Sequence, residues 1–440
     1  MAILIENGCV YIDKDNIIAN GYVGITDGKI DFISSDRSDA DNFIVKYGNG
    51  LERIDASNKV IISGLVNSHT HTPMVILRNY GSDRTLQDWL FNKIIPKEQL
   101  LSEDDVYWGS LAAQAEMIKS GTTAFADMYF YMDSIAKAVA DSGMRANLCV
   151  PVLTNDWSSG KKVTKEIISQ AKEYLRNWNN SNSGRIKTYV ELHSTYLYDA
   201  AKLYNNIETA KEMNTGIHMH LHETIKEVTE SVSEFGKEPI EMLEELGAFN
   251  VPVVAAHCVH MSETAMGIIT KYNVNVAHNP TSNMKLASGF CPVPEFLRRG
   301  INVALGTDGC ASNNNLNMFE EMHITALIHK GYTLNPTVLK AYEVITMATE
   351  NGAKAIGFGD ICGKLEVGRA ADIIIVKLSG THLTPLNDLE SAIVYSMQGQ
   401  DVDTVIVNGK ILMKKRQFRY LDEELIMAKV RSIAKRIFNT

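Results

Sequence analysis

The chain lacks the long apolar runs of a membrane protein and the paired cysteines of a disulfide framework or a thiolate zinc site. No apolar stretch in its 440 residues approaches the roughly 20 residues that cross a bilayer. The first residues, MAILIENGCVYIDKDN, lack the charged segment and apolar run of a signal peptide. Its 6 cysteines include no Cys-x-x-Cys pair, which indicates structural thiols in a reducing compartment. We therefore expect a soluble, cytoplasmic protein with no membrane partner.

Positive charge is also scarce. The chain has 43 lysines and arginines against 52 aspartates and glutamates, a formal net charge of -9, and it contains no long basic run. Such a balance gives no electrostatic footprint for the phosphates of nucleic acid or for an anionic membrane surface. We therefore expect a small, uncharged or cationic substrate and no nucleic-acid partner.

The two ends of the chain are rich in short β-type runs. Residues 1–58 alternate such runs with turn signals and show no helical periodicity, which predicts an all-β segment. The same texture returns in residues 363–420, where Asn408 and Gly409 predict a hairpin turn. We predict that these two segments form one composite β-sandwich domain and that residues 421–440 form a C-terminal helix.

The middle of the chain, residues 59–362, alternates strand-like runs with amphipathic helical stretches. RIKTYVELHS is followed by AAKLYNNIETAKEMN, and VPVVAAHC is followed by SETAMGIITKYN. Repeated strand and helix units predict a parallel sheet, and the whole chain is longer than the roughly 250 residues of a lone barrel. The predicted fold is therefore α/β: a TIM-like (β/α)8 barrel with a smaller β-sandwich domain built from both chain ends.

Two groups of candidate metal ligands stand near the ends of strand-like runs. In β/α barrels the functional side chains come from the carboxyl ends of different strands, so the ligands of one site are far apart in sequence. VNSHTHTP places His69 and His71 on one face of a strand, and INVALGTDG ends in Asp308 between glycines that permit close approach. Taken alone, the first pair is equally consistent with two hydrogen-bonding histidines, and Asp308 with a helix cap.

Two further strand-like runs carry histidines. GIHMHLHET puts His220 on one face and Glu223 nominally on the other, so Glu223 reaches the same centre only if the strand ends between them. VVAAHCVHMS delivers His257 at the end of a strand, and His260 in the following loop is the weaker candidate. Imidazole and carboxylate ligands without thiolates suit zinc, and also iron(II) or manganese. We predict one divalent metal ion and favour zinc.

Together these motifs resemble a known family. The segments VNSHTH, HLHE, AAHCVH, HNPTSNMKLASG, GTDGCASNNNLNMFEEM and GKLEVGRAADIIIV resemble the amidohydrolase superfamily, most closely its 5-methylthioadenosine/S-adenosylhomocysteine deaminases. The resemblance covers nearly the whole chain. It implies the barrel with a composite β-sandwich, and metal-dependent hydrolysis of an adenine nucleoside to the inosine analogue and ammonia. It also implies a nucleoside as the small-molecule partner, and we expect a homo-oligomer.

The resemblance assigns roles to particular residues. It implies that the metal is bound by His69, His71, His220 and Asp308, and that Glu223, His257 and Asp308 are catalytic. Glu98, in IIPKEQL, matches the carboxylate that grips the ribose hydroxyls, and His193, in ELHSTYLYD, matches the histidine that bonds the purine ring. We also expect Glu223 and Asp308 to contact the substrate.

One position departs from the family pattern. The family can use an arginine on the strand after the GMR segment to grip the homocysteine carboxylate, and this chain has Val150 there. Lys162 is a poor substitute, and Arg145, which precedes Val150, has a structural interpretation. We therefore expect 5-methylthioadenosine or adenosine to be preferred over S-adenosylhomocysteine.

Two alternative functions stay open at this point. Another deaminase of the guanine or cytosine type, or a triazine-type hydrolase, shares the metal ligands, although Glu223 with His257 favours deamination. A non-catalytic metal-binding protein needs only the four ligands and leaves Glu223 idle. The deaminases that edit nucleic acids use a Pro-Cys-x-x-Cys segment, which this chain lacks.

Overall fold

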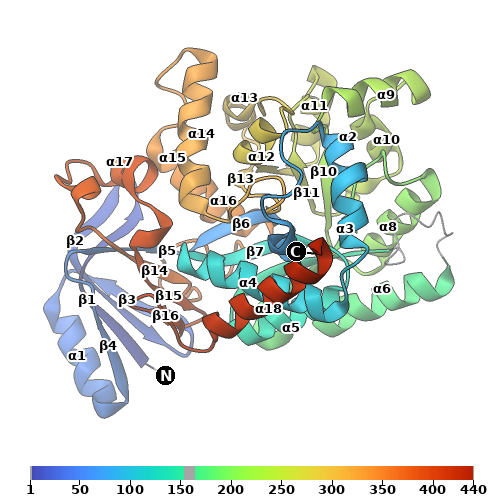
Figure 1. Cartoon of the computed structure of the whole chain (residues 1–440). Coiled ribbons are helices and arrows are strands. Elements are labelled where there is room, and N and C mark those ends of the chain that lie inside the picture. The colour runs from blue at the N-terminus through green and yellow to red at the C-terminus, as the bar shows by residue number, and fades with distance from the viewer. Residues whose placement is uncertain (1, 153–163, 440) are drawn as a thin grey trace.

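The structure is a computed structural model, and it describes residues 2–152 and 164–439. Its strands form two sheets, one of eight strands and one of nine. Figure 1 shows the eight-stranded sheet ringed by helices, with the nine-stranded sheet beside it. In the described ranges no helix is both long and apolar enough to cross a membrane.

The eight-stranded sheet is the barrel that the sequence predicts. Its strands pair in sequence order, and each is parallel to the next. The first and last strands meet where the backbone N–H of Asp308 donates to the carbonyl oxygen of His69, at 2.9 Å. The strands are β6 (Leu65–Thr70), β7 (Thr122–Met128), β8 (Arg145–Pro151), β9 (Ile186–Leu192), β10 (Ile217–Leu221), β11 (Val253–His257), β12 (Asn275–His278) and β13 (Val303–Leu305).

Amphipathic helices cover the outside of the barrel. The helix predicted from SETAMGIITKYN begins after Ser262, whose side chain accepts a hydrogen bond from the Ala265 N–H, and it buries an apolar face against the barrel. The main helices are α4 (Glu103–Lys119), α5 (Met132–Ser142), α6 (Lys165–Trp178), α8 (Ala200–Glu212), α9 (Ile225–Phe235), α10 (Pro239–Glu245), α11 (Glu263–Lys271), α12 (Pro280–Lys285), α13 (Val293–Arg298), α14 (Met318–Thr333), α15 (Ala341–Met347) and α16 (Glu350–Ala355).

A helical segment between β6 and α4 crosses the mouth of the barrel. It consists of a 3-10 turn (Thr72–Leu77), α2 (Leu86–Trp89), a π-turn (Leu90–Ile94) and α3 (Ile95–Glu98). Because it starts directly after the first histidine pair, this segment brings its own side chains over the carboxyl ends of the strands.

The nine-stranded sheet joins the two ends of the chain. Strand β5 pairs with β1 from the N-terminal end and with β14 from the C-terminal end, so the two halves form one mixed sheet. Isoleucines from both halves, such as Ile3 and Ile375, are buried in one cluster. We propose that this sheet and the barrel are the cores of two domains. Its strands are β1 (Ala2–Asp13), β2 (Asn16–Thr26), β3 (Lys29–Ser34), β4 (Leu51–Asp55), β5 (Lys59–Ser63), β14 (Ile373–Lys377), β15 (Val402–Val407), β16 (Lys410–Lys414) and β17 (Gln417–Phe418).

The all-β prediction for residues 1–58 is wrong at one place. Helix α1 (Arg37–Tyr47) lies between β3 and β4, and the Asp36 side chain caps it by accepting from the Ser38 N–H. Its buried residues are Ala40 and Phe43, which pack with Leu4 and Tyr22 of the sheet. The apolar periodicity of α1 is weak, so the sequence pattern does not reveal the helix. Packing of its two buried residues against the sheet stabilises it.

The last helix, α18 (Glu423–Phe438), lies along α4, as Figure 1 shows. Its Ile426 packs with Leu111 of α4 and Ala138 of α5. At its far end, Lys97 of α3 donates to the carbonyl oxygen of Ile437 at 3.0 Å. The ring of Tyr80 packs on that of Phe438, with centroids 4.9 Å apart. The C-terminal helix is therefore fixed to the segment that crosses the barrel mouth.

A buried ion pair connects the barrel to the mixed sheet. Arg145, at the start of β8, donates from Nε and Nη2 to both carboxylate oxygens of Asp372, at 2.8 and 3.1 Å. The two side chains are 1% and 2% exposed. Asp372 also accepts from the backbone N–H of Asn408 in the turn between β15 and β16, at 2.7 Å. This buried ion pair agrees with the structural interpretation of Arg145.

We expect Arg145→Met to lower the free energy of unfolding by about 3–5 kcal/mol, because it leaves the buried Asp372 carboxylate without its cation. Urea denaturation followed by circular dichroism measures the change. The double variant Arg145→Met/Asp372→Leu removes both charges and is expected to recover part of the loss. A single variant within about 1 kcal/mol of the parent would show that the pair contributes little.

Candidate active site

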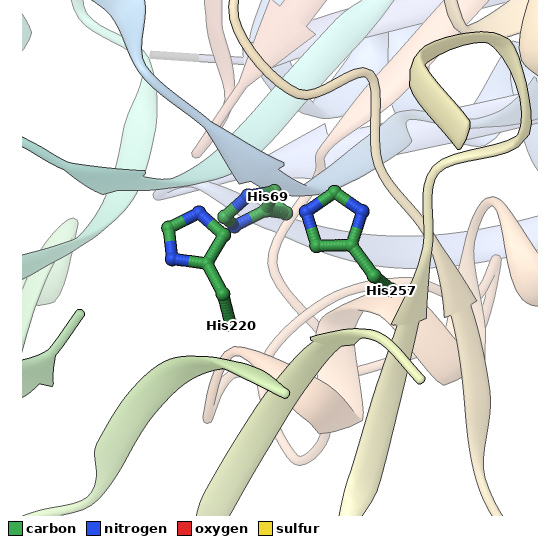
Figure 2. Close-up of side chains that lie close together, drawn as sticks. All are labelled: His69, His220 and His257. Atoms are coloured by element: carbon green, nitrogen blue, oxygen red, sulfur yellow. The ribbon is translucent and has the colours of Figure 1, made fainter. Parts of the chain in front are cut away.

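Five side chains from four barrel strands converge at the mouth of the barrel. His69 lies near the end of β6 with His71 directly after it, His220 lies on β10, His257 ends β11, and Asp308 follows β13. Figure 2 shows His69, His220 and His257 with their rings turned toward one another. The sequence prediction that distant strand ends converge here is therefore met by the geometry.

The potential ligand atoms form two groups that share His69, and within each group they are close enough to bind one metal ion. Those of His69, His71 and Asp308 lie within 4.8 Å of one another, and so do those of His69, His220 and His257. Nε2 of His71 is 3.2 Å from Asp308 Oδ1 and 3.2 Å from His220 Nε2. Nε2 of His69 is 3.5 Å from Asp308 Oδ1. These spacings suit atoms that face a common centre.

Each histidine is oriented through its second nitrogen. Nδ1 of His71 donates to the carbonyl oxygen of Met128 at 2.6 Å, and Nδ1 of His220 donates to that of His193 at 2.9 Å. Nδ1 of His69 is hydrogen-bonded to the His218 ring at 3.0 Å. Such bonds fix the ring and, where Nδ1 donates, leave the Nε2 lone pair for a metal.

Asp308 is held by its loop. Its Oδ2 accepts hydrogen bonds from the hydroxyls of Ser282 and Ser312, at 2.6 and 2.8 Å, and its Oδ1 accepts from the Gly309 N–H at 2.8 Å. Asp308 has a φ of 63°, in the left-handed region. A non-glycine residue in this region is uncommon and is often found at functional sites.

The chemistry of this group fits a divalent cation. Nε2 of His69 is buried and has no hydrogen-bond partner among the described residues. A bound metal would supply this missing partner. Burial lowers the pKa of His69 to about 4 and that of His220 well below its usual value, so both imidazoles stay neutral and able to bind a metal. The Asp308 carboxylate outweighs burial at His71 and raises its pKa to about 9, so a metal must displace a proton there. The chemistry of the four residues that the resemblance implies as ligands therefore fits a metal centre.

The other two histidines of the HMHLH segment have structural partners. His218 lies beneath His69, and its Nδ1 is 3.6 Å from the Cys149 sulfur. His222 donates to the carbonyl oxygen of His260 at 2.9 Å, and His260 donates to that of Ser288 at 2.7 Å. Neither His222 nor His260 belongs to the ligand groups of the described residues.

Glu223 reaches the site because strand β10 ends before it. Strand β10 ends at Leu221, and His222 has a φ of 52°, which breaks the strand alternation. The Glu223 carboxylate then lines the pocket, accepts from the Ser288 hydroxyl at 3.1 Å and lies 3.9 Å from His257 Nε2. Burial raises the pKa of Glu223, which favours its proton-carrying form.

His257 is set beside this carboxylate by a strained strand end. It has a φ of 73°, and its Nδ1 donates to the side-chain oxygen of Asn283 at 2.8 Å. Its Nε2 consequently faces Glu223 and the metal ligands. The expected neighbours Glu223 and His257 are thus brought together.

A pocket opens over these residues. Glu98 of α3 and His193 after β9 line it together with His71, His220 and Asp308, so both predicted substrate-binding residues lie at the site. Burial raises the pKa of Glu98 to about 7 and lowers that of His193 to about 3. The remaining wall is mainly apolar and consists of Met74, Leu86, Trp89, Leu90, Ile95, Met128, Tyr129, Phe130, Tyr196, Leu197 and Leu286, with Glu191 as a further acid.

Sequence reasoning missed the hydroxyl and amide groups that hold the reactive side chains. Ser282 and Ser288 both lie in the HNPTSNMKLASG segment, Ser282 within α12 and Ser288 after it. Their roles become visible only through contacts with Asp308 and Glu223. His278, at the end of β12, contacts His329, with Nε2 atoms 3.2 Å apart. Asn283 supports His257.

Val150 does not line the pocket. It lies in β8 and is 8% exposed, and it borders a neighbouring cavity with Phe130 and Tyr174. Lys162, the weak substitute for the missing arginine, lies outside the described residues.

Comparison with known proteins agrees with this arrangement. Residues 60–412 match the model of the amidohydrolase family. The chain is 50% identical over 439 residues to a 5-methylthioadenosine/S-adenosylhomocysteine deaminase of Acetivibrio thermocellus, covering 99% of this chain and 100% of the relative.

Solved structures share the fold. An adenosine deaminase from Xanthomonas campestris with bound zinc superposes with a TM-score of 0.93 and 32% identity, over 100% of this chain and 99% of the other. An atrazine chlorohydrolase from Arthrobacter aurescens has a TM-score of 0.86 at 24% identity, over 98% of this chain and 100% of the other, and at that identity it supports the fold alone. The resemblance seen in the sequence is confirmed, and the chain belongs to the amidohydrolase family.

Proposed function

We propose that the protein hydrolyses the amino group of an adenine nucleoside, giving the inosine analogue and ammonia. The observation that carries this proposal is the buried Glu223 carboxyl group, placed beside His257 in the same pocket as the metal-ligand group. The relatives named as 5-methylthioadenosine/S-adenosylhomocysteine deaminase and adenosine deaminase support the same substrate class.

We propose that His69, His71, His220 and Asp308 hold one zinc ion. The zinc in the Xanthomonas campestris structure supports this choice of metal, and the ligand set without thiolates is compatible with it. A bound divalent ion lowers the pKa of a water molecule from 15.7 to about 7, which makes a nucleophile available at neutral pH.

Asp308 and His257 act on the attacking oxygen. The Asp308 carboxylate lies between the ligand histidines, so it is placed to accept the proton that the attacking water loses. His257 Nε2, fixed through Asn283, is placed to orient that oxygen and to stabilise developing negative charge. The new C–O bond forms at the ring carbon that carries the amino group.

Glu223 acts on the ring. Its carboxyl group is placed to protonate the ring nitrogen next to the reacting carbon, so that the electron pair released by attack is accommodated there. Asp308 passes the proton that it took from the water to the amino group, which leaves as ammonia. The proton left on the attached oxygen returns to Glu223, and the ring keeps the oxygen as a carbonyl. Burial raises the pKa of Glu223, which favours the protonated form from which it donates.

Glu98 and His193 position the nucleoside. One carboxylate can accept hydrogen bonds from two neighbouring hydroxyls, so Glu98 is suited to the ribose diol. His193, whose pKa is lowered to about 3, is neutral and can donate to a ring nitrogen. Both residues line the pocket that contains the ligand group.

The far part of the pocket favours an apolar 5′ substituent. The described residues that line it include no lysine or arginine, and Met74, Leu86 and Leu90 contribute to its wall. A homocysteine carboxylate would lose hydration there without gaining a cation from the described part of the chain. Adenosine or 5-methylthioadenosine should therefore have a kcat/KM at least about 10-fold above that of S-adenosylhomocysteine. A factor of this size corresponds to the loss of one charge-assisted hydrogen bond.

Ammonia release from a panel of substrates tests both the activity and this preference. The panel contains adenosine, 5-methylthioadenosine, S-adenosylhomocysteine, guanine, cytosine and an amino- or chlorotriazine, with metal-reconstituted protein. An equal or higher kcat/KM for S-adenosylhomocysteine would defeat the preference. Hydrolysis of guanine, cytosine or the triazine alone would replace the proposed substrate class, and no hydrolysis at all would favour a non-catalytic metal-binding protein.

A further inference from the structure

One buried carboxyl group of the pocket has no role in the mechanism above. Glu191 lies on β9, two residues before His193, and is fully buried. Its Oε1 accepts a hydrogen bond from the Tyr198 hydroxyl at 3.4 Å. Its Oε2 is buried and has no hydrogen-bond partner among the described residues, although Glu191 lines the pocket.

Glu191 shares its side of the pocket with two other incompletely bonded groups. Oε1 of Glu98 and the hydroxyl of Tyr129 are likewise buried; the two side chains interact with each other, and these atoms have no further hydrogen-bond partner in the described part of the chain. The charge of Glu98 raises the pKa of both Glu191 and Tyr129, so the three groups lie near one another. All three line the pocket.

A purely structural role explains Asp127 well but not Glu191. Asp127 is also buried, yet it accepts hydrogen bonds from the Thr72 N–H and hydroxyl and from the Thr70 hydroxyl, at 2.7, 2.5 and 3.0 Å. Buried polar atoms are almost always hydrogen-bonded, so several unmatched oxygens in one pocket wall indicate a ligand that completes them.

The unmatched atoms complement one part of a nucleoside. The amino group and ring nitrogens of adenine face the ligand group, Glu223 and His193 in the proposed mechanism. The ribose hydroxyls remain, and each brings a donor that a carboxyl oxygen can accept. We propose that Glu191 is a further substrate-binding residue, which together with Glu98 and Tyr129 binds the ribose hydroxyl groups. This inference rests on the proposed nucleoside deamination.

Burial makes two neighbouring carboxyl groups compatible with such a site. Burial raises the pKa of Glu98 to about 7 and that of Glu191 to about 8, and the negative charges of Asp127 and Glu98 add to the second shift. Near neutral pH the pair therefore does not carry two full negative charges, and the protonated partner can donate as well as accept.

Kinetics with deoxynucleosides test the inference. The kcat and KM of adenosine, 2′-deoxyadenosine and 3′-deoxyadenosine are measured for the parent protein, Glu191→Leu and Glu191→Met. We expect either variant to raise the KM of adenosine roughly 3- to 10-fold, the effect of one lost hydrogen bond, and to change kcat less. The preference for adenosine over one of the deoxynucleosides should shrink by a similar factor, because the variant no longer detects that hydroxyl.

Tyr198→Phe is the matched control. It removes the bond to Glu191 Oε1, leaves Oε2 in place, and affects a side chain that does not line the pocket in the described residues. Its deoxynucleoside preferences should equal those of the parent. Unchanged preferences in the folded Glu191 variants, or the same change in Tyr198→Phe, would overturn the inference while adenosine deamination by the parent stands. A parent protein that deaminates no nucleoside would remove the proposed function and this inference with it.

Discussion

Glu223→Gln is expected to keep its metal and to lose between about 10² and 10⁴ in kcat, the usual contribution of a general acid or base. The amide has the same shape and can still accept from Ser288, but it has no proton to deliver to the ring nitrogen. Metal content by elemental analysis and steady-state ammonia release measure the two halves of this expectation.

Glu230→Gln is the control for this variant. Glu230 lies on α9, the helix that follows Glu223, and its side chain is 63% exposed, so its loss of charge should leave kcat unchanged. Full turnover by Glu223→Gln would reject the proton-transfer role. Loss of metal in the same variant would instead make Glu223 part of the metal centre.

Removal of the metal is expected to reduce ammonia release to the detection limit. Without the ion, the described side chains do not lower the pKa of water to about 7. The clustered imidazoles also lose the cation that their nitrogens would bind. Zinc added back to the stripped protein should restore turnover. The metal-free protein should also melt at a lower temperature, because an ion that binds only the folded state stabilises it.

His220→Ala and His260→Ala separate a ligand from a structural histidine. His220 belongs to the ligand group, whereas His260 donates to the carbonyl oxygen of Ser288. Only the first variant should fail to retain zinc on dialysis. If the parent protein kept its full activity after dialysis and in the presence of a chelator, a metal-dependent reaction would be contradicted.

Strand-end placement explains why much of this site can be predicted from the sequence. His69, His220, His257 and Asp308 each follow an apolar run, and parallel strands bring their carboxyl ends together whatever the detailed register. The condition that β10 must end before Glu223 also follows from strand alternation, and β10 does end at Leu221.

The remaining features depend on contacts that strand patterns do not encode. Helix α1 escapes prediction because only Ala40 and Phe43 are buried along it. Glu191 sits in an ordinary strand pattern, and its unmatched oxygen becomes visible only when α3 and β7 place Glu98 and Tyr129 nearby. The expected homo-oligomer and the cytoplasmic location stay predictions from the sequence.

The anchoring of α18 has a practical consequence for protein engineering. Because Lys97 and Tyr80 hold the last turn of this helix, a shortened carboxyl end would loosen the short helix that presents Glu98. Nucleoside affinity would then fall while the metal content stayed intact. A purification handle at that end should therefore be joined through a flexible spacer, so that Ile437 and Phe438 keep their contacts.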